Sequence, residues 1–409
     1  MVTATHAPMN LFPVEEGELV VGGLPISRLA ERIGRTPFYV YERRLLDLRV
    51  RELRAALPTG IDLHYAVKAN PMPALVGHMV DLVDGFDVAS GGELRVALDA
   101  GMDASRISFA GPAKTEAELT QAVAAGILIN VESFREIRLL REHAARRHRP
   151  ARVAIRVNPD FELKYSGMKM GGGPKQFGID AELVPQALAE IRDAGVAFEG
   201  FHIFSGSQNL QPASICDAQS QAFDLAVRLA KSSPSPVRTV NLGGGFGIPY
   251  FPGELPLDLQ PIGAHLSMLV QKARTALPEA RLVVELGRYL VGEAGLYVCR
   301  IIDRKISRGQ VFLIADGGLH HHLAASGNFG QVIRKNYPVT IGNRMASPNV
   351  EQASVVGPLC TPLDILADKM SLAEAHEGDL VVVFQSGAYG FTASPLQFLG
   401  HPPPEQVLV

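Results

Sequence analysis

The sequence predicts an α/β protein built as a (β/α)8 TIM barrel with a second, mainly β domain. From about residue 61, short β-branched runs alternate with helical patterns, which is typical of repeated βαβ units around a parallel sheet. Eight such strands are the number that a closed barrel needs. After Glu285 the pattern changes to strand-like runs without regular helices between them. A chain of 409 residues is also too long for one ordinary compact domain.

Start and stop signals separate the predicted barrel elements. Ser90 followed by Glu93, and Thr115 followed by Glu118, are capping-box patterns that begin helices, and the glycines at 101 and 126 indicate helix ends. Loops at 171–174 and 249–261 are too rich in glycine or proline for regular structure. The predicted strands are 61–67, 86–89, 107–110, 127–131, 152–157, 197–203, 237–242 and 281–285.

The second domain is predicted from both ends of the chain. We expect the barrel to span 44–288, because a barrel that begins near residue 61 does not need the N-terminal segment. Segments 1–43 and 289–409 are then expected to form a β-sandwich or barrel-like domain. Its predicted strands are 18–21, 38–41, 296–302, 311–315, 351–356 and 379–384.

The composition argues against several classes of partner. The 39 Lys and Arg residues nearly balance the 42 Asp and Glu residues, so no overall field favours nucleic acid or an anionic membrane. Cys216, Cys299 and Cys360 fit neither a disulfide framework nor a zinc ribbon. We recognise no signal peptide and no membrane-spanning run. We therefore expect a cytoplasmic protein that acts on a small molecule, without nucleic-acid or membrane partners.

Candidate catalytic and ligand-binding residues follow most of the predicted strands. Barrel enzymes carry their sites at the C-terminal ends of the strands, where side chains from different strands meet. A lysine, an arginine, a carboxylate and a run of glycines are therefore expected at one mouth. The residues that follow or end these strands are Lys68, Ser90, Arg156, Asn158, Phe204, Ser207, Gly243, Gly244, Gly245, Glu285, Gly287 and Arg288.

The three glycines after the seventh strand are a candidate phosphate site. Gly243 to Gly245 allow backbone amides to point together at an anion, and Arg288 adds a planar fork suited to phosphate. The run does not match the dinucleotide pattern, because Ile248 stands where a third glycine is required. A tight strand-to-helix turn would explain the glycines equally well. Their position after strand seven, a recurrent phosphate site in barrels, favours phosphate.

Lys68 is the candidate nucleophile. The residues before it should lie in the barrel wall, so that its side chain points into the mouth. Desolvation there would lower the lysine pKa toward neutrality and allow a Schiff base with an aldehyde. The alternative, for an isolated lysine, is a stem lying along the strand end with the ammonium in solvent.

Seven ordered segments together resemble one known family. They are 65–70 (YAVKAN), 86–93 (FDVASGGE), 206–208 (GSQ), 243–245 (GGG), 285–288 (ELGR), 357–360 (GPLC) and 386–389 (SGAY). The family is that of the fold-type III, alanine-racemase-like barrel decarboxylases, including diaminopimelate and ornithine decarboxylases. Segments 109–112, 166–173 and 202–208 look like its exosortase A system-associated subgroup, a name that records association with exopolysaccharide loci. The resemblance covers nearly the whole chain and implies pyridoxal 5'-phosphate as the cofactor.

The resemblance also implies roles for individual residues. Lys68 would hold the cofactor as a Schiff base, and Tyr389 would close over it. Glu285 would keep the pyridine nitrogen protonated, so that the ring accepts the electrons of decarboxylation as a quinonoid carbanion. Cys360 would reach across a homodimer interface and reprotonate the α-carbon, although a free cysteine is more often a buried structural thiol. Further implied cofactor contacts are Asp87, Arg156, Phe204, Ser207, Gly243, Gly244, Gly245, Gly287 and Arg288.

Two departures from the family pattern bear on the ring and the substrate. Phe204 stands where better-known members have a histidine that stacks on the ring, and His202 lies two residues earlier, so we expect Phe204 to stack. Cys360 is followed by Thr361 rather than by an acidic residue that pairs with a distal ammonium, and Asp364 is displaced. A charged distal amine would be poorly bound there. We expect a neutral, acidic or carrier-linked amino acid as substrate.

Three functions remain open: a decarboxylase, a racemase or epimerase on the same fold, and a protein that binds the cofactor without turnover. Glu285 and Cys360 disfavour the racemase. Retention of the β domain, Cys360 and Tyr389 disfavours the non-catalytic protein.

The remaining polar motifs give weaker indications. His320, His321 and His322 are expected at the rim, since three adjacent side chains do not readily converge on one ion, and no metal site is expected. A solvated interface face is the alternative for Arg334 and Tyr337. The candidate substrate contacts are Asp316, Arg334, Tyr337, Thr361 and Asp364.

Overall fold

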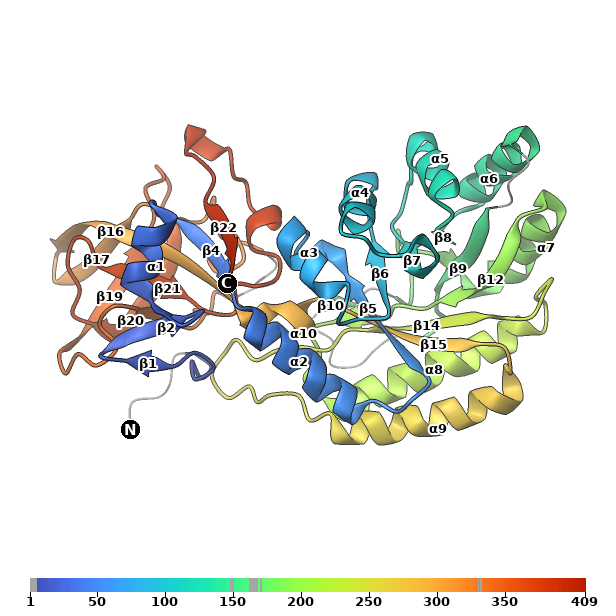
Figure 1. Ribbon diagram of the computed structural model, residues 1–409, viewed down its shortest axis with the longest axis horizontal. Helices are drawn as coiled ribbons and strands as arrows, with labels where there is room; N and C mark the ends of the chain where they lie inside the picture. Colours follow the sequence, from blue (N-terminus) through green and yellow to red (C-terminus); the bar gives the residue numbers. More distant parts are fainter. Residues whose placement is uncertain (1–5, 148–150, 162–167, 170, 330, 332) are drawn as a thin grey trace. The chain divides into compact units, whose positions relative to one another are not determined.

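The computed structural model describes residues 6–147, 151–161, 168–169, 171–329, 331 and 333–409 (Figure 1). The chain forms two compact units. The barrel unit comprises Arg49–Gly247 and Leu257–Gly287, and the β unit comprises Met1–Leu48, Ile248–Pro256 and Arg288–Val409. Ile248–Pro256, which the sequence analysis placed with the barrel, is thus grouped with the β unit. In the part of the chain that the structure describes, no helix is long and apolar enough to cross a bilayer.

Eight parallel strands close into the barrel, which confirms the predicted fold class. The order is β9, β12, β14, β15, β5, β6, β7 and β8, and β8 pairs with β9 to complete the circle. Every predicted strand is found with ends shifted by at most two residues. The strands are β5 (Ile61–Ala66), β6 (Gly85–Val88), β7 (Ile107–Phe109), β8 (Leu128–Val131), β9 (Arg152–Asn158), β12 (Ala197–His202), β14 (Thr239–Gly244) and β15 (Arg281–Leu286).

Two of the helices between these strands begin at the predicted capping residues, and the two predicted glycines follow their ends. Ser90 accepts a hydrogen bond from the Glu93 amide at 3.1 Å, and Thr115 and Glu118 form a complete capping box. Gly126 ends its helix in the left-handed conformation. The helices are α2 (Arg43–Ala56), α3 (Pro73–Met79), α4 (Gly91–Asp99), α5 (Glu116–Ala125), α6 (Phe134–Arg147), α7 (Val184–Ala194), α8 (Pro212–Ala230) and α9 (Gln260–Ala276).

Short elements complete the barrel unit. β10 (Met168–Lys169) pairs with β13 (Gly206–Ser207), and β11 (Ile179–Asp180) extends the sheet beside β9. Three 3-10 turns are η1 (Val67–Ala69), η2 (Ala104–Arg106) and η3 (Ala181–Leu183). Of the predicted motif 166–173, residues 166, 167 and 170 lie outside the described residues.

The barrel interior is polar near the C-terminal ends of its strands. His202 on β12 reaches Glu285 on β15 although β14 lies between these strands, so both side chains project into the interior. Barrel interiors are usually filled by branched apolar side chains. Here the buried polar residues on the strands include Asp87, Ser108, Asn130, Arg156, His202, Asn241 and Glu285. Burial of so many polar groups requires that they satisfy one another or a ligand.

The β unit is built on a mixed sheet. Its order is β18, β21, β16, β17, β19 and β20, and β4 pairs with both β16 and β22. The six predicted strands are present, but β18, β20, β22 and helix α1 were not predicted. The main strands are β4 (Phe38–Tyr41), β16 (Gly295–Ser307), β17 (Gln310–Ala315), β18 (Val339–Ile341), β19 (Val350–Val356), β20 (Ile365–Ala373), β21 (Leu380–Val383) and β22 (Glu405–Leu408). Smaller elements are β1 (Val14–Glu15), β2 (Glu18–Val21), β3 (Leu24–Pro25), α1 (Ile26–Ile33), α10 (Arg288–Val291), η4 (Gly292–Ala294), η5 (Phe391–Ala393) and η6 (Phe398–Gly400).

Candidate active site

Lys68 and Glu285 form the centre of the barrel mouth. Lys68 lies in η1, directly after β5, and Glu285 lies on β15, the strand that pairs with β5. Lys68 Nζ is 3.5 Å from Glu285 Oε1 and 5.3 Å from the centre of the Phe204 ring. The Lys68 side chain is 40% exposed, so the expected desolvation of this amine is wrong. Its ammonium is oriented by the carboxylate rather than by burial.

Glu285 is a buried carboxylate held by polar neighbours. It is 4% exposed, its Oε2 lies 3.0 Å from His202 Nε2, and Asn241 Nδ2 donates to the same oxygen at 3.3 Å. Burial alone would raise the pKa of the Glu285 carboxyl. The charge of Lys68 and the hydrogen bond and charge of His202 outweigh burial and lower this pKa well below its usual value. The group is therefore ionised at neutral pH and can hold a protonated nitrogen of a ligand.

Asp87 on β6 is a second buried carboxylate of the barrel interior. It is 5% exposed, and the Ser108 hydroxyl donates to its Oδ1. His64 Nδ1 lies 3.3 Å from its Oδ2. The Asn130 amide donates to the Ser108 hydroxyl at 3.1 Å, so the polar contacts continue across β7 and β8. Asp87 is thus a fixed acceptor on β6, the strand that pairs with β5, and Lys68 directly follows β5.

Arg156 on β9 forms a buried ion pair with Glu132, which follows β8. Its Nη1 is 2.9 Å from Glu132 Oε1, and the two side chains are 7% and 2% exposed. Glu132 also accepts a hydrogen bond from the backbone amide of Gly178 at 3.1 Å. The Arg156 guanidinium lies 5.0 Å from the centre of the Phe177 ring. Glu132 therefore connects Arg156 to the loop 171–178 that follows β9.

Close packing explains much of the glycine run after β14. Gly243 and Gly245 have φ of +71° and +75°, a left-handed conformation that favours glycine. A Cβ on Gly244 would clash with the backbone oxygen of Glu285, and one on Gly245 with β13. The Gly243 amide donates to Asn241 Oδ1 at 2.8 Å. Packing alone requires these glycines, so their phosphate role stays a prediction.

Two further predicted cofactor contacts lie beside these strands. Ser207 is a half-buried residue of β13, which is next to the glycine run. Gly287 follows β15, and a Cβ there would lie 2.8 Å from the Ala69 Cβ. The glycine therefore lets the turn that carries Lys68 pack against the end of β15.

Arg288 begins α10 in the β unit and is surrounded by tyrosines. Its Nη1 donates to the Tyr250 hydroxyl at 2.6 Å, and its guanidinium lies 4.8 Å from the centre of the Tyr389 ring. The rings of Tyr250 and Tyr337 have centres 4.6 Å apart. Tyr389 has a φ of +54°, a strained conformation for a bulky residue. Arg288 Nε is buried without a hydrogen-bond partner among the described residues, so this donor is left for a ligand.

Cys360 lies in the turn between β19 and β20 and is exposed, unlike a buried structural thiol. Thr361 beside it is half-buried. Asp364 is 2% exposed, and its two oxygens accept backbone hydrogen bonds from Leu319 at 2.6 Å and Leu359 at 2.9 Å. Asp364 therefore orders the turn inside the protein, and its role as a substrate contact stays a prediction.

The other predicted substrate contacts all touch protein groups. Asp316 Oδ1 accepts a backbone hydrogen bond from β16 at 2.8 Å. Arg334 donates to the carbonyls of Ser326 and Ile365 at 3.0 and 2.8 Å. Tyr337 is 6% exposed and lies against Tyr250. A substrate role for these residues stays a prediction.

The three adjacent histidines are buried, contrary to the expected rim position. His320, His321 and His322 are 0%, 1% and 0% exposed. His321 Nδ1 lies 3.3 Å from the Tyr297 hydroxyl, and His322 Nε2 lies 2.9 Å from the Ser386 hydroxyl. Burial lowers their pKa values to about 3, about 4 and about 3, so they pack as neutral rings. Within the described ranges, no group of three or more His, Cys, Asp or Glu side chains could hold a metal ion.

Sequence reasoning did not identify several residues of the site. Asn241 lies two positions before Gly243, and His202 two positions before Phe204, so proximity to a motif was an available signal. Tyr250 follows the glycine run closely. Glu132 carries no motif, and its position just after the fourth strand was the one available indication.

This fold and this mouth define a barrel enzyme in which a lysine beside an ionised glutamate can hold an aldehyde cofactor. Residues 43–292 match the family described as pyridoxal-dependent decarboxylase, pyridoxal binding domain. The L-glutamyl-[BtrI acyl-carrier protein] decarboxylase of Niallia circulans is 39% identical over 389 residues, which cover 94% of this chain and 90% of the relative. The diaminopimelate decarboxylase of Aquifex aeolicus is 33% identical over 385 residues, which cover 93% and 88%.

A solved structure agrees with these sequence matches. The diaminopimelate decarboxylase of M. jannaschii in complex with L-lysine superposes with a TM-score of 0.87 at 26% identity, covering 98% of this chain and 93% of that one. The chain belongs to the pyridoxal-dependent decarboxylase family. Pyridoxal phosphate is accordingly its cofactor, and decarboxylation is its class of reaction.

The residues present fit this cofactor in their chemistry. Lys68 offers an amine for the aldehyde, and Glu285 offers an ionised carboxylate for the pyridine nitrogen. In the β unit, the unpartnered Nε of Arg288 is a donor of the type that binds phosphate, and its role toward the cofactor stays a prediction. An amine, an anion and a guanidinium are the groups that these three parts of pyridoxal phosphate require.

Proposed function

We propose that the protein removes the α-carboxylate of an L-amino acid that is carried as a conjugate, with a carrier-bound glutamyl group as the leading candidate. The observation that supports decarboxylation is the ionised Glu285 beside Lys68. When bound, pyridoxal phosphate supplies an electron sink for the bond that breaks at the α-carbon. An ionised Glu285 would keep the ring nitrogen protonated, which this electron sink requires. A racemase would work better with a ring that accepts electrons less strongly.

We assign each side chain one task. Lys68 would hold the cofactor through its aldehyde, and the glycines 243–245, Ser207 and Arg288 would bind the phosphate. Phe204, whose ring centre lies 5.3 Å from Lys68 Nζ, would stack on the pyridine ring. Asp87 and Arg156 would be further cofactor contacts, and Tyr389 would close over the cofactor.

Cys360 is proposed to return a proton to the α-carbon of the substrate bound by a second subunit. Its exposure on the single chain agrees with such a role, because a donor that acts on another subunit must be accessible before assembly. The protein would then act as a homodimer with shared sites. The association with exosortase loci, implied by the resemblance alone, also stays a prediction.

The preference for a conjugate depends on the turn that carries Cys360. Asp364 is the acidic residue of this turn nearest to Cys360, and both its oxygens accept backbone hydrogen bonds. A distal ammonium placed there would lose water without gaining an anion. The carrier-bound substrate named for the Niallia circulans relative has no such ammonium on its side chain, since glutamate ends in a carboxyl group.

Release of carbon dioxide from a substrate panel tests this proposal. The purified protein, loaded with pyridoxal phosphate, is given L-glutamate joined through its side-chain carboxyl as a thioester to a phosphopantetheine carrier protein, so that the α-carboxylate stays free. Free L-glutamate, L-lysine, L-ornithine and diaminopimelate complete the panel. We expect kcat/KM for the carrier thioester to exceed that for any free amino acid by at least about tenfold. Efficient turnover of lysine, ornithine or diaminopimelate would contradict the substrate class. Loss of optical activity without carbon dioxide would show a racemase instead.

A further inference from the structure

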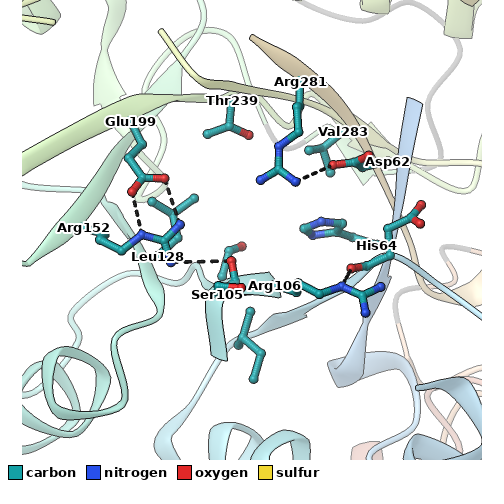
Figure 2. Close-up of a pocket in the computed structure, with 13 residues that line it drawn as sticks. Asp62, His64, Ser105, Arg106, Leu128, Arg152, Glu199, Thr239, Arg281 and Val283 are labelled. Atoms are coloured by element: carbon teal, nitrogen blue, oxygen red, sulfur yellow. Dashed lines mark hydrogen bonds and ion pairs between the residues drawn. The ribbon is translucent and has the colours of Figure 1, made fainter. Parts of the chain in front are cut away.

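The N-terminal end of the barrel, opposite the mouth, contains a polar cavity. Its volume is about 200 Å³, and its walls include Ile107, Leu128, Arg152, Thr239 and Arg281, which are the first residues of five barrel strands. Figure 2 shows two ion pairs in its walls: Arg152 binds Glu199, and Arg281 lies 3.2 Å from Asp62. Arg106 donates to backbone carbonyls of residues 83 and 84, and Asp84 lies 2.7 Å from Arg54. Polar groups that are engaged with other protein groups thus surround the cavity.

His64 connects this cavity to Asp87. Its imidazole projects into the cavity in Figure 2, and its Nδ1 lies 3.3 Å from Asp87 Oδ2. Gly85 makes room for the ring, because a Cβ there would lie 2.6 Å from His64 Nε2. Ser108 also lines the cavity and donates to Asp87 Oδ1. Asp87 is therefore separated from the cavity by single side chains, although it is only 5% exposed.

We propose that His64 is a positioning residue that carries a proton beside Asp87, and that this buried pair exchanges protons with solvent through the cavity at the N-terminal end of the barrel. Water in the cavity gives up the proton as the imidazole gains it, and no other bond changes. The inference rests on the proposed function in one respect, namely that Asp87 belongs to the cofactor site. It goes further because it assigns a task to the opposite end of the barrel.

The surroundings of His64 favour its protonated form. Burial alone would lower the His64 pKa, but the charge and hydrogen bond of Asp87, and the charges of Asp62 and Glu285, raise it above 6.5. The arginines that line the cavity are engaged elsewhere: Arg106 with backbone carbonyls, Arg152 with Glu199 and Arg281 with Asp62. Among the described residues that line the cavity, His64 is thus the group directed at Asp87 whose protonation would add a positive charge there.

The route matters because it does not pass through the mouth. Bound cofactor and substrate exclude water from the mouth of such a site. A buried histidine and aspartate that could equilibrate only through the mouth would then keep whatever charge they had before closure. Access from the other end lets the net charge beside Asp87 follow the solvent pH at every stage of turnover.

Hydrogen–deuterium exchange at histidine Cε1, read by mass spectrometry, tests the inference on the unmodified holoenzyme. This exchange reports the water access and the pKa of each imidazole separately. His376, which is exposed, is the fast reference, and His322, 0% exposed, is the slow one. We expect His64 to exchange at least about tenfold faster than His322, to titrate above 6.5, and to keep its rate when a substrate analogue fills the mouth. Exchange as slow as that of His322, or a rate that collapses when the analogue binds, would overturn the inference.

A variant series gives a second readout that a purely structural role would not move. The visible absorbance of the lysine-bound cofactor is followed against pH in the wild type, in His64→Gln and in His376→Gln as the matched control. We expect His64→Gln to shift or remove a transition that His376→Gln leaves unchanged. Identical profiles in all three proteins would contradict the inference. If the wild type shows no cofactor absorbance at all, the proposed function fails, whereas the exchange data on His64 still decide the proton route.

Discussion

Glu285 in the barrel unit and Asp364 in the β unit are equally buried carboxylates, 4% and 2% exposed, but they have different partners. Glu285 is held by Lys68 and His202, side chains that can carry a positive charge. Asp364 accepts backbone amides of Leu319 and Leu359. Burial is thus the same in both regions, whereas the partners decide whether a carboxylate serves chemistry or architecture.

The two pKa values follow the same division. Burial alone would raise both. At Glu285 the neighbouring positive charges reverse the effect of burial and lower the pKa, whereas at Asp364 burial outweighs the backbone hydrogen bonds and the pKa is raised. An ionised carboxylate that neighbouring cations maintain can pair with a further cation from a ligand. A carboxylate enclosed by backbone amides is not available to pair with a cation from a ligand.

The largest expected effect is that of Glu285→Gln. The amide keeps the shape but cannot hold a protonated ring nitrogen, so we expect kcat to fall at least about a hundredfold. The protein should still fold and bind pyridoxal phosphate, because Lys68 and the phosphate contacts remain. Steady-state carbon dioxide release and cofactor absorbance measure the two properties. Near-normal kcat would contradict the role assigned to this carboxylate.

The matched change in the β unit, Asp364→Asn, should lower the stability of the protein more than its activity. One of the two backbone amides would then face an amide NH2 group instead of an oxygen, and we expect the free energy of unfolding to fall by about 1–3 kcal/mol. Activity per folded, cofactor-loaded molecule should change less than in Glu285→Gln. Urea unfolding and active-site titration separate stability from activity. Unchanged stability with lost substrate binding would instead support the predicted substrate contact of Asp364.

A smaller effect is expected for Tyr250→Phe. The Tyr250 hydroxyl fixes Arg288 at 2.6 Å, so its removal loosens the guanidinium that we assign to the phosphate. We expect the Kd of pyridoxal phosphate to rise about tenfold, and that of pyridoxal, which lacks the phosphate, to stay within about twofold. Fluorescence titration of the cofactor-free protein measures both. Tyr297→Phe removes a buried tyrosine hydroxyl of the same unit that lies near His321, and serves as the control.

Equal weakening of pyridoxal and pyridoxal phosphate in Tyr250→Phe would show a general structural defect. An unchanged Kd for both would remove Tyr250 from the phosphate site.

The smallest expected effect concerns the pH dependence of stability in His64→Gln. The folded-state pKa of His64 is raised above its ordinary value of 6.5, so protonation favours the folded state. This contribution is complete below pH 6.5 and is lost as the pH rises through the folded-state pKa. We expect His64→Gln to be destabilised relative to wild type by about 1 kcal/mol at pH 6, and by less at pH 9. Urea unfolding at the two values measures the difference, and a cost that grows with pH would contradict the assignment.

The barrel was predictable because its strands are short apolar runs separated by strong helix signals. Each strand end was located within two residues, since the period of the pattern changes there. In the β unit, β20 was missed because its buried and exposed positions do not alternate regularly. β18 and β22 were also missed, and they gain their order by pairing with β21 and β4.

The site was predictable in its residues but less so in their environments. Motifs located Lys68 and Glu285, whereas neither the exposure of Lys68 nor the partners of Glu285 can be read from a linear pattern. The three histidines from His320 were expected at the rim because polar runs usually face solvent. The aromatic core around Tyr297 and the hydroxyl of Ser386 bury them instead. Tertiary partners decide such positions, and they come from segments distant in the sequence.

The polar interior of the barrel also bears on the heat capacity of unfolding. Exposure of apolar surface raises the heat capacity, and exposure of polar surface lowers it. A barrel whose axis is occupied by Asp87, Asn130, Arg156 and Glu285 releases less apolar surface per residue than one filled with Val, Ile and Leu. Its stability curve against temperature should therefore be flatter than that of an apolar barrel of equal length, with less loss of stability on cooling.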